Sequence, residues 1–125
     1  MNITKAEIEQ YLRDVFTAVN AGRYQIAQRD KNEELYREYV FTEEDAKKVI
    51  LSLTVYDFSE AVPNEHPDYP EEVLYIFGKD VMLLSRYGET EETVSLYIKF
   101  NKLTNQYVFV ISLHKQEYPL SYKFR

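Results

Sequence analysis

The sequence contains no cysteine and no tryptophan, and only three glycines. Without cysteine, a disulfide framework and a thiolate metal site are excluded. No apolar run approaches the roughly 20 residues of a membrane helix, and no opening segment has the pattern of a signal peptide. With so few glycines, neither a glycine-rich phosphate loop nor a dinucleotide-binding fold is expected. We therefore expect a cytoplasmic protein with no membrane attachment and no cofactor.

Charge is unevenly distributed along the chain. The net charge of −6 argues against indiscriminate nucleic-acid binding, and direct DNA binding is not expected. Residues 1–60 hold twelve acidic and eight basic side chains, whereas residues 93–125 hold five basic side chains against Glu117 alone. The last segment is therefore locally cationic. Such lysines occur in an edge hairpin that resists aggregation, and equally in a surface that contacts phosphate.

Two helices are indicated in the first half of the chain. Thr4 and Glu7 have the spacing of a capping box, and apolar residues follow at helical intervals as far as Gly22, a plausible helix end. This predicts a helix over residues 5–21. Thr42 and the acidic residues after it open a second helix, with a short further turn capped by Thr54. Residues 31–40 are polar and show no clear pattern.

Strand-like segments dominate the second half. Residues 23–30 suggest a short strand, and residues 62–72, with three prolines, suggest an irregular loop. The segments 73–77, 81–86, 93–101 and 106–115 alternate as strands do, with turns expected at 78–80, 88–92 and 104–105, and the tail 117–125 as a possible edge strand. We expect a single domain over residues 1–125, of α+β class. Two N-terminal helices would pack on a mainly antiparallel sheet of four to six strands, whose other face is partly open.

The last hairpin gathers unusual polar side chains on one face. Strand alternation separates Tyr97 and Lys99 from the apolar residues between them, and does the same for Ser112 and His114. A two-residue turn at 104–105 predicts Tyr97 opposite Ser112, and Ser95 opposite His114. The same register predicts that Phe109, Ile111 and Leu113 face the core, with Val108 and Val110 on the opposite face.

This group of side chains suits metal-free RNA cleavage. That reaction needs a base for the 2′-hydroxyl, cations beside the phosphate and an acid for the leaving 5′-oxygen. Histidine titrates near neutral pH, which suits His114 to acid–base work. Lys99 and Lys115 would stabilise the phosphorane, and Tyr97 would bond the phosphate or act as acid or base. Only RNA carries the required 2′-hydroxyl.

Simpler interpretations stand beside this one. A polar sheet face is most often only solvated, and a histidine near a strand end is more often a surface residue than a catalytic one. His66 lies among acidic residues of the 62–72 loop, where a metal site is conceivable but a solvated acidic loop is favoured. We therefore expect no metal.

Several short motifs resemble the MqsR family of mRNA-interferase toxins, in the same order along the chain. They are "VNAG" (19–22), "VILSLTVYDF" (49–58), "EVLY" (72–75), "LYIK" (96–99) and "VISLHK" (110–115). The resemblance implies a RelE-like fold and a ribosome-independent endoribonuclease that cuts mRNA and is held inactive by a cognate antitoxin protein. It carries the family's functional tyrosine onto Tyr97, and its C-terminal lysine onto His114 or Lys115.

Further positions complete this interpretation. We take Tyr97, Lys99, His114 and Lys115 as candidate catalytic residues, and Ser112, Lys102 and Arg86 as candidate contacts to the substrate. The chain departs from the family at Glu60, where a lysine is expected, and at Glu71, where a glutamine is expected. These departures favour the alternative of a non-catalytic RelE-like module that acts through a protein partner. A third possibility is a ligand-binding protein with tyrosines around an enclosed apolar cavity.

Overall fold

The computed structural model describes residues 2–88 and 90–125, which form an α+β fold. The helices are α1 (Lys5–Asn20), α2 (Asp30–Glu38), α3 (Glu43–Leu51) and a short 3₁₀ turn, η1 (Val55–Asp57). The strands are β1 (Tyr24–Ile26), β2 (Phe58–Pro63), β3 (Val73–Leu84), β4 (Glu91–Lys102) and β5 (Val108–Lys115). No helix of the described part is long and apolar enough to cross a membrane.

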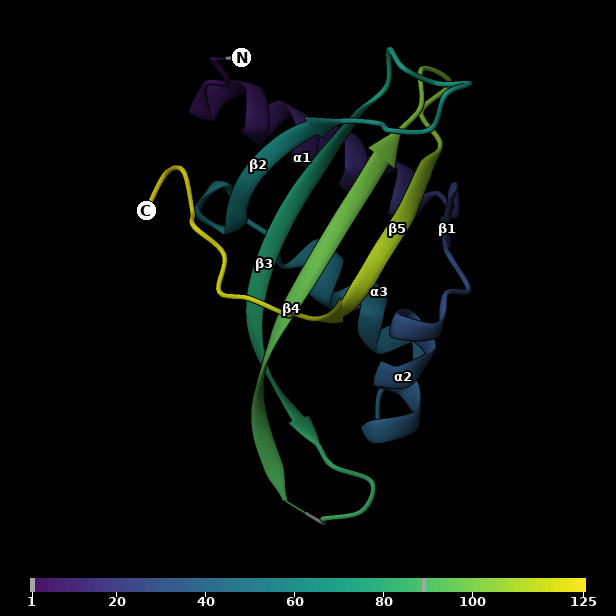
Figure 1. Cartoon of the computed structure of the whole chain (residues 1–125), viewed down its shortest axis with the longest axis vertical. Coiled ribbons are helices and arrows are strands. Elements are labelled where there is room, and N and C mark those ends of the chain that lie inside the picture. The colour runs from purple at the N-terminus through teal and green to yellow at the C-terminus, as the bar shows by residue number, and fades with distance from the viewer. Residues whose placement is uncertain (1, 89) are drawn as a thin grey trace.

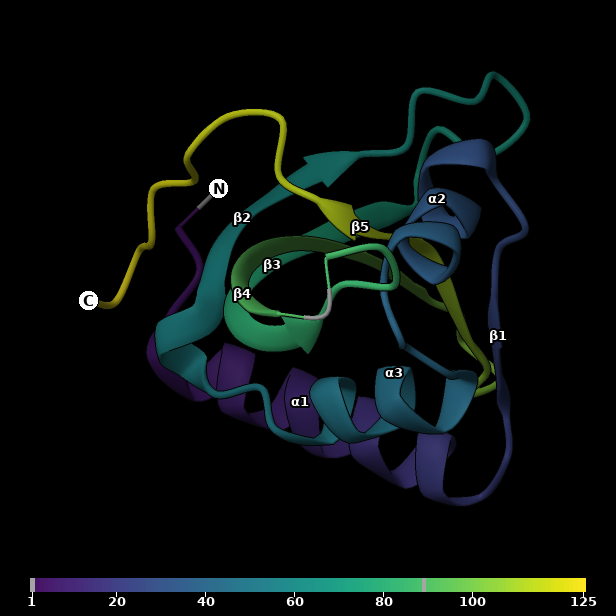
Figure 2. The same ribbon diagram turned by 90° about the horizontal axis from the view of Figure 1, so that it is seen from below.

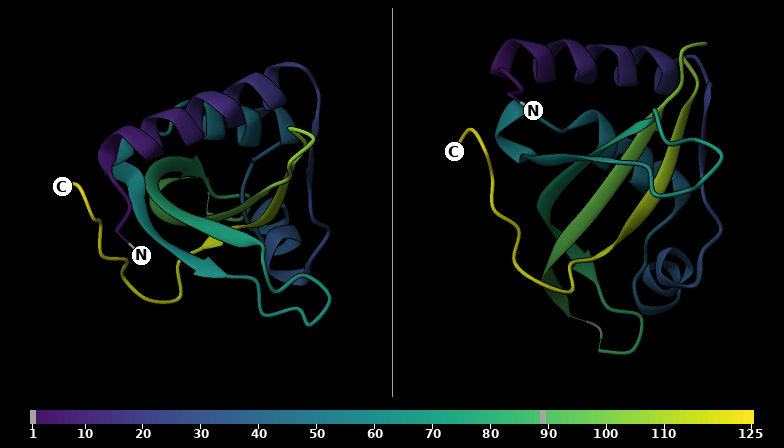
Figure 3. Two further views of the ribbon diagram at one scale, coloured as in Figure 1. Left: turned by 90° about the horizontal axis from the view of Figure 1, so that it is seen from above. Right: turned by 45° about the horizontal axis from the view of Figure 1, so that its top comes forward.

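The strands form one mixed sheet in the order β1-β5-β4-β3-β2. Only β1 runs parallel to its neighbour, and the other pairs are antiparallel. α1 and α3 cover one face of this curved sheet, whereas the 64–72 loop and the C-terminal tail lie over the other (Figures 2 and 3). We call these the inner and the outer face.

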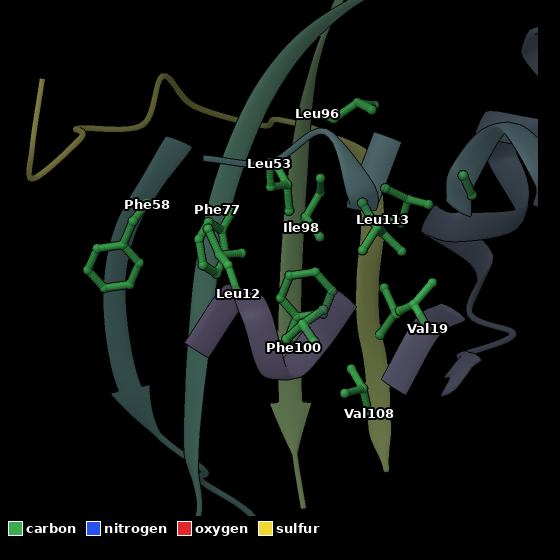
Figure 4. Close-up of a cluster of buried hydrophobic side chains, with 14 of the residues drawn as sticks. Leu12, Val19, Leu53, Phe58, Phe77, Leu96, Ile98, Phe100, Val108 and Leu113 are labelled. Carbon is green, nitrogen blue, oxygen red and sulfur yellow. The ribbon is translucent and has the colours of Figure 1, made fainter. Parts of the chain in front are cut away.

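The core lies between the inner face and α1. Figure 4 shows Phe58, Phe77 and Phe100 on three strands, with Leu12 drawn close to Phe77 and Phe100. All three phenylalanines are fully buried, and pairs of their rings meet edge to face at 5.5–5.6 Å between centroids. This contiguous apolar core fixes which residues of β4 must face outward.

The predicted helix starts are confirmed, and the first helix ends at Asn20, one residue before the predicted end. Thr4 and Glu7 form the capping box of α1, and Gly22 follows the helix with φ of 75°, a conformation that suits glycine. Thr42 caps α3 in the same way, and Thr54 caps η1. The expectation of two helices was incomplete, because residues 30–38 form α2, which has no side-chain cap.

The strand predictions need three corrections. Residues 78–80 do not turn, because β3 continues through them to Leu84. β2 was not predicted, and the tail bonds to β2 through Lys123 N–H and Phe58 O (3.1 Å) without forming a strand. In the expected turn at 88–92, Glu89 lies outside the described residues, and Glu91 already belongs to β4.

The register of the β4–β5 hairpin differs from the predicted one by two residues. Tyr97 pairs with His114, and Lys99 pairs with Ser112. One residue of the difference comes from the connection, which is a longer turn closed by Leu103 N–H and Tyr107 O (2.8 Å). The other comes from a β-bulge, because Lys99 pairs with Ser112 but Phe100 pairs with Val110.

The bulge also corrects the predicted faces of β5. Val108 and Val110 are fully buried in the core, whereas Phe109 is 38% exposed on the outer face. Ile111 is the extra residue, and beyond it Leu113 faces the core as predicted. The prediction was thus right for residues 112–114 and wrong for residues 108–110.

Candidate functional site

The outer face of the hairpin carries a cleft of about 230 Å³, which we call the Lys99 cleft. Its walls are formed by Arg29, Lys31, Tyr97, Lys99, Ser112, His114, Glu117, Tyr118 and Leu120. Tyr97 and Lys99 come from β4 and Ser112 and His114 from β5, so two successive cross-strand pairs form its base. The structure therefore brings together four of the seven residues that the sequence singled out.

Tyr97 and His114 form one of these pairs. Their rings are stacked, with centroids 5.2 Å apart and planes 12° from parallel. His114 Nδ1 lies 2.8 Å from the carbonyl oxygen of Lys115. A carbonyl only accepts, so Nδ1 is the donor in this contact and Nε2 is the nitrogen left for other partners. The imidazole is held in orientation by both contacts.

Lys99 and Ser112 form the other pair, beside Arg29. Arg29 Nη1 lies 3.4 Å from Ser112 Oγ and 3.5 Å from Ile111 O. Burial lowers the pKa of the Lys99 ammonium, and the nearby guanidinium of Arg29 lowers it further, whereas Glu65 opposes them. A lysine with a lowered pKa gives up its proton more readily than an exposed one.

Tyr97 keeps its proton at neutral pH. Burial raises the pKa of its phenol, and the Glu60 carboxylate adds to that shift, whereas Arg29 opposes it. The phenol is therefore a hydrogen-bond donor in the cleft. Glu60 therefore acts electrostatically on this site.

Asn32 of α2 fixes the bulge from which the cleft is built. Its Nδ2 donates to Ile111 O (3.1 Å) and Ala27 O (2.8 Å), and its Oδ1 accepts from Leu113 N–H (2.9 Å). Asn32 is 1% exposed, so these bonds are buried. The amide replaces a neighbouring strand at the point on β5 where the pairing with β1 has ended.

The C-terminal tail closes one side of the cleft. In Figure 1 it runs in yellow from the end of β5 across β4 and β3 toward β2. Tyr118 and Leu120 line the cleft, and Arg125 anchors the end of the tail through Tyr56 O (2.8 Å) and Asp57 Oδ1 (3.3 Å). The tail passes over Gly78, where an added Cβ would collide with the Tyr122 hydroxyl.

Three predicted residues lie outside the cleft. Lys115 Nζ is 2.7 Å from Glu38 Oε2, which raises the pKa of that lysine. Lys102 Nζ is 2.8 Å from Asp14 Oδ2. Arg86 Nε donates to the carbonyl oxygens of Tyr36 and Tyr39 (3.0 Å each). These cations are committed to partners on other parts of the molecule.

Several cleft residues were missed by sequence reasoning. Arg29 and Lys31 precede or open α2, the helix that was not predicted. Lys31 is paired with Glu117 of the tail, which lowers the pKa of that carboxyl. In the sequence, Arg29 and Lys31 could be noticed only as two basic residues shortly after β1, the strand that pairs with β5. His66 lies outside the Lys99 cleft, and in residues 2–88 and 90–125 no three His, Cys, Asp or Glu side chains gather as a metal site would require.

Comparisons with known proteins match no family model, no curated protein and no solved structure.

Proposed function

We propose that this chain is a metal-free endoribonuclease that acts in the Lys99 cleft. We further propose that it serves as the toxin of a type II toxin–antitoxin system, with mRNA as substrate and a cognate antitoxin protein as inhibitor. A RelE-like fold of the MqsR kind belongs to the same proposal. The observation that carries it is the meeting of an oriented imidazole, a lysine of lowered pKa and an arginine in one open cleft.

The cleft residues divide the reaction among them. His114 Nε2 takes the proton from the 2′-hydroxyl as the O2′–P bond forms. Arg29 and the Tyr97 phenol neutralise and bond the non-bridging oxygens of the phosphorane. Lys99 gives its proton to the 5′-oxygen as the P–O5′ bond breaks. The products are a 2′,3′-cyclic phosphate and a 5′-hydroxyl, so atoms and protons balance.

The acid side chains around the cleft support a second candidate function. Glu60 and Glu65 act electrostatically on Tyr97 and Lys99, and Lys31 is neutralised by Glu117. Negative charge at these places weakens phosphate binding. A non-catalytic module that acts through a protein partner would retain the same cleft without cleaving RNA.

One experiment separates the two functions. Purified full-length protein is incubated with a mixed-sequence RNA in EDTA, beside Tyr97→Phe, Lys99→Ala, Arg29→Ala and His114→Ala. We expect discrete cuts with 2′,3′-cyclic phosphate ends from the wild type, and their loss in the Lys99, Arg29 and His114 variants. Intact RNA after incubation with folded wild-type protein would contradict the endoribonuclease and favour the binding module. Loss of cutting in Lys99→Ala but not in His114→Ala would contradict the role of His114.

A further inference from the structure

A second hollow lies on the outer face next to the Lys99 cleft. It encloses about 380 Å³ between the 64–72 loop and the tip of the β4–β5 hairpin, and we call it the Phe109 pocket. The right-hand view of Figure 3 shows this loop crossing over the strands. Asn101, which lines the pocket, follows Lys99 by two residues on β4, so about 7 Å separates the two positions along one face. The pocket is thus placed to receive the unit next to a phosphate held in the cleft.

Aromatic rings are exposed to solvent in this pocket. Phe109 is 38% exposed and Tyr69 is 49% exposed, although both are large apolar side chains. His66 packs beside Tyr69 with 5.3 Å between ring centroids, and Tyr107 supports Phe109 at 5.2 Å. Exposed, supported rings of this kind provide stacking surfaces for flat ligands such as nucleobases.

The polar groups of the pocket are arranged as hydrogen-bond acceptors. Glu72 Oε1 accepts from Asn64 Nδ2 (3.1 Å) and from Asn101 Nδ2 (3.0 Å). These bonds use the amide donors, and among the described residues none bonds to Glu72 Oε2 or Asn101 Oδ1. Neither oxygen is fully buried, so each is accessible to solvent or to a ligand. A ligand that donates hydrogen bonds would satisfy these oxygens.

The charges around the two hollows favour different chemical groups of a ligand. The loop over the Phe109 pocket carries Glu65, Asp68, Glu71 and Glu72, which repel a phosphate. The Lys99 cleft presents Arg29 and Lys99, which attract one. A nucleic-acid strand across this face would therefore place its phosphate in the cleft and a neutral base in the pocket.

We propose that the Phe109 pocket binds one base of single-stranded RNA and favours bases that carry an amino group over uracil. Adenine, cytosine and guanine each present an amino donor, whereas uracil presents one N–H between two carbonyl acceptors. Two acceptor oxygens would bond the first three bases and repel the carbonyls of uracil. This inference rests on the proposed function, because it assumes that RNA is the ligand of the adjoining cleft.

The test uses two fluorescein-labelled tetranucleotides, oligo-C and oligo-U, with 2′-O-methyl groups that prevent cleavage through the 2′-oxygen. Their length and charge are equal, so fluorescence anisotropy with the full chain compares the bases alone. We expect tighter binding of oligo-C. Phe109→Ala should weaken oligo-C binding about five- to hundredfold, the range for loss of one stacked base. Tyr87→Ala, which removes an 86% exposed aromatic on the far hairpin, should leave binding unchanged.

A second variant tests the acceptors without removing the stacking ring. Glu72→Gln retains an oxygen for the Asn64 and Asn101 amides but replaces the other oxygen with a donor. We expect the preference for oligo-C over oligo-U to shrink to within about threefold of equality, because the site then offers a donor that a uracil carbonyl accepts.

The outcomes distinguish this pocket from the proposed function. Equal binding of oligo-C and oligo-U by the wild type, or unchanged oligo-C binding by Phe109→Ala, overturns the pocket even where natural RNA is still cut. Natural RNA that stays intact, together with Phe109-dependent preference for oligo-C, overturns the endoribonuclease and supports the pocket. If neither oligonucleotide binds, the pocket is overturned as well.

Discussion

The two halves of β5 place different kinds of side chain on the inner and the outer face of the sheet. Before the bulge, Val108 and Val110 enter the core and Phe109 faces outward. After it, Leu113 enters the core, and Ser112 and His114 face outward. One extra residue, Ile111, separates an aromatic surface from a surface suited to acid–base chemistry. A single strand can therefore supply two chemically distinct neighbouring sites.

The two halves also differ in the groups that are hydrogen-bonded to the side of β5 away from β4. The first half is bonded to the backbone of β1 over three residue pairs. The second half has the side chain of Asn32 in that place. The chemistry of the cleft therefore depends on one buried amide, whereas the aromatic half depends on regular strand pairing. This contrast can be tested at four places.

The largest effect is expected where the second half supplies a reacting group. His114→Ala should reduce RNA cleavage about 10²- to 10⁴-fold, because a positioned acid–base group contributes that much. The matched control is the next residue, Lys115→Ala, whose ammonium is bound to Glu38 outside the cleft. Initial rates of cleavage of a labelled RNA would measure both. Equal losses of cleavage rate in the two variants would contradict the assignment of the reacting group to the outer face that carries His114.

The next effect concerns the amide that replaces the strand. Asn32→Ala should lower the free energy of unfolding by about 2–4 kcal/mol, because the backbone groups Leu113 N–H and Ala27 O lose their partner. Urea denaturation followed by circular dichroism would measure this. Thr104→Ala, in the exposed turn of the same hairpin, serves as control and should change stability by less than about 1 kcal/mol. A loss that small in Asn32→Ala would show that the bulge does not need the amide.

A smaller effect is expected where the tail covers the second half. Gly78 lies in the same cross-strand row as Tyr97 and His114. Gly78→Ala would press a methyl group against the ends of the Tyr122 and Leu120 side chains, costing about 1–3 kcal/mol or displacing the tail. Limited proteolysis should then cut the tail faster than in the wild type. Gly88→Ala is the control, since an added Cβ there meets nothing closer than 3.4 Å.

The smallest effect is a gain in stability at Lys99. Because the pKa of Lys99 is lowered in the folded protein, the unfolded chain binds the proton more tightly, and wild-type stability rises with pH through that range. Lys99→Met removes this half-buried charge. Its melting temperature should therefore exceed that of the wild type slightly at pH 7, with the difference vanishing as pH approaches the ordinary lysine value of 10.5. A variant less stable than the wild type at pH 7 would contradict the inferred burial cost.

The sequence predicted best where local chemistry decides the structure. The helix starts at Thr4 and Thr42 follow from side-chain bonds to backbone groups three residues away. α2 escaped prediction because it has no side-chain cap and is held by contacts with β5. Arg29, which precedes α2, and Lys31 and Asn32 in its first turn were therefore missing from the predicted site.

Long-range contacts explain the other errors. Gly78 was taken for a turn, but it makes room for the tail, whose residues are about forty positions away. The segment 73–77 is apolar on both faces, and Leu74 and Ile76 are buried there although they lie outside the main core. That pattern indicates a strand covered on both sides, which was a usable signal for the covered outer face. The bulge at Ile111 had no comparable signal, because its partner is the distant Asn32.

The bulge has a consequence for how chains of this fold are aligned with one another. An extra residue in β5 shifts the alternation of side chains by one residue, so each side chain after it lies on the opposite face from the one a regular strand would give it. A related chain without it would present its outward side chains one position earlier relative to the turn. An ungapped alignment would then match His114 with a residue of the opposite face, and the correct correspondence requires a gap at Ile111.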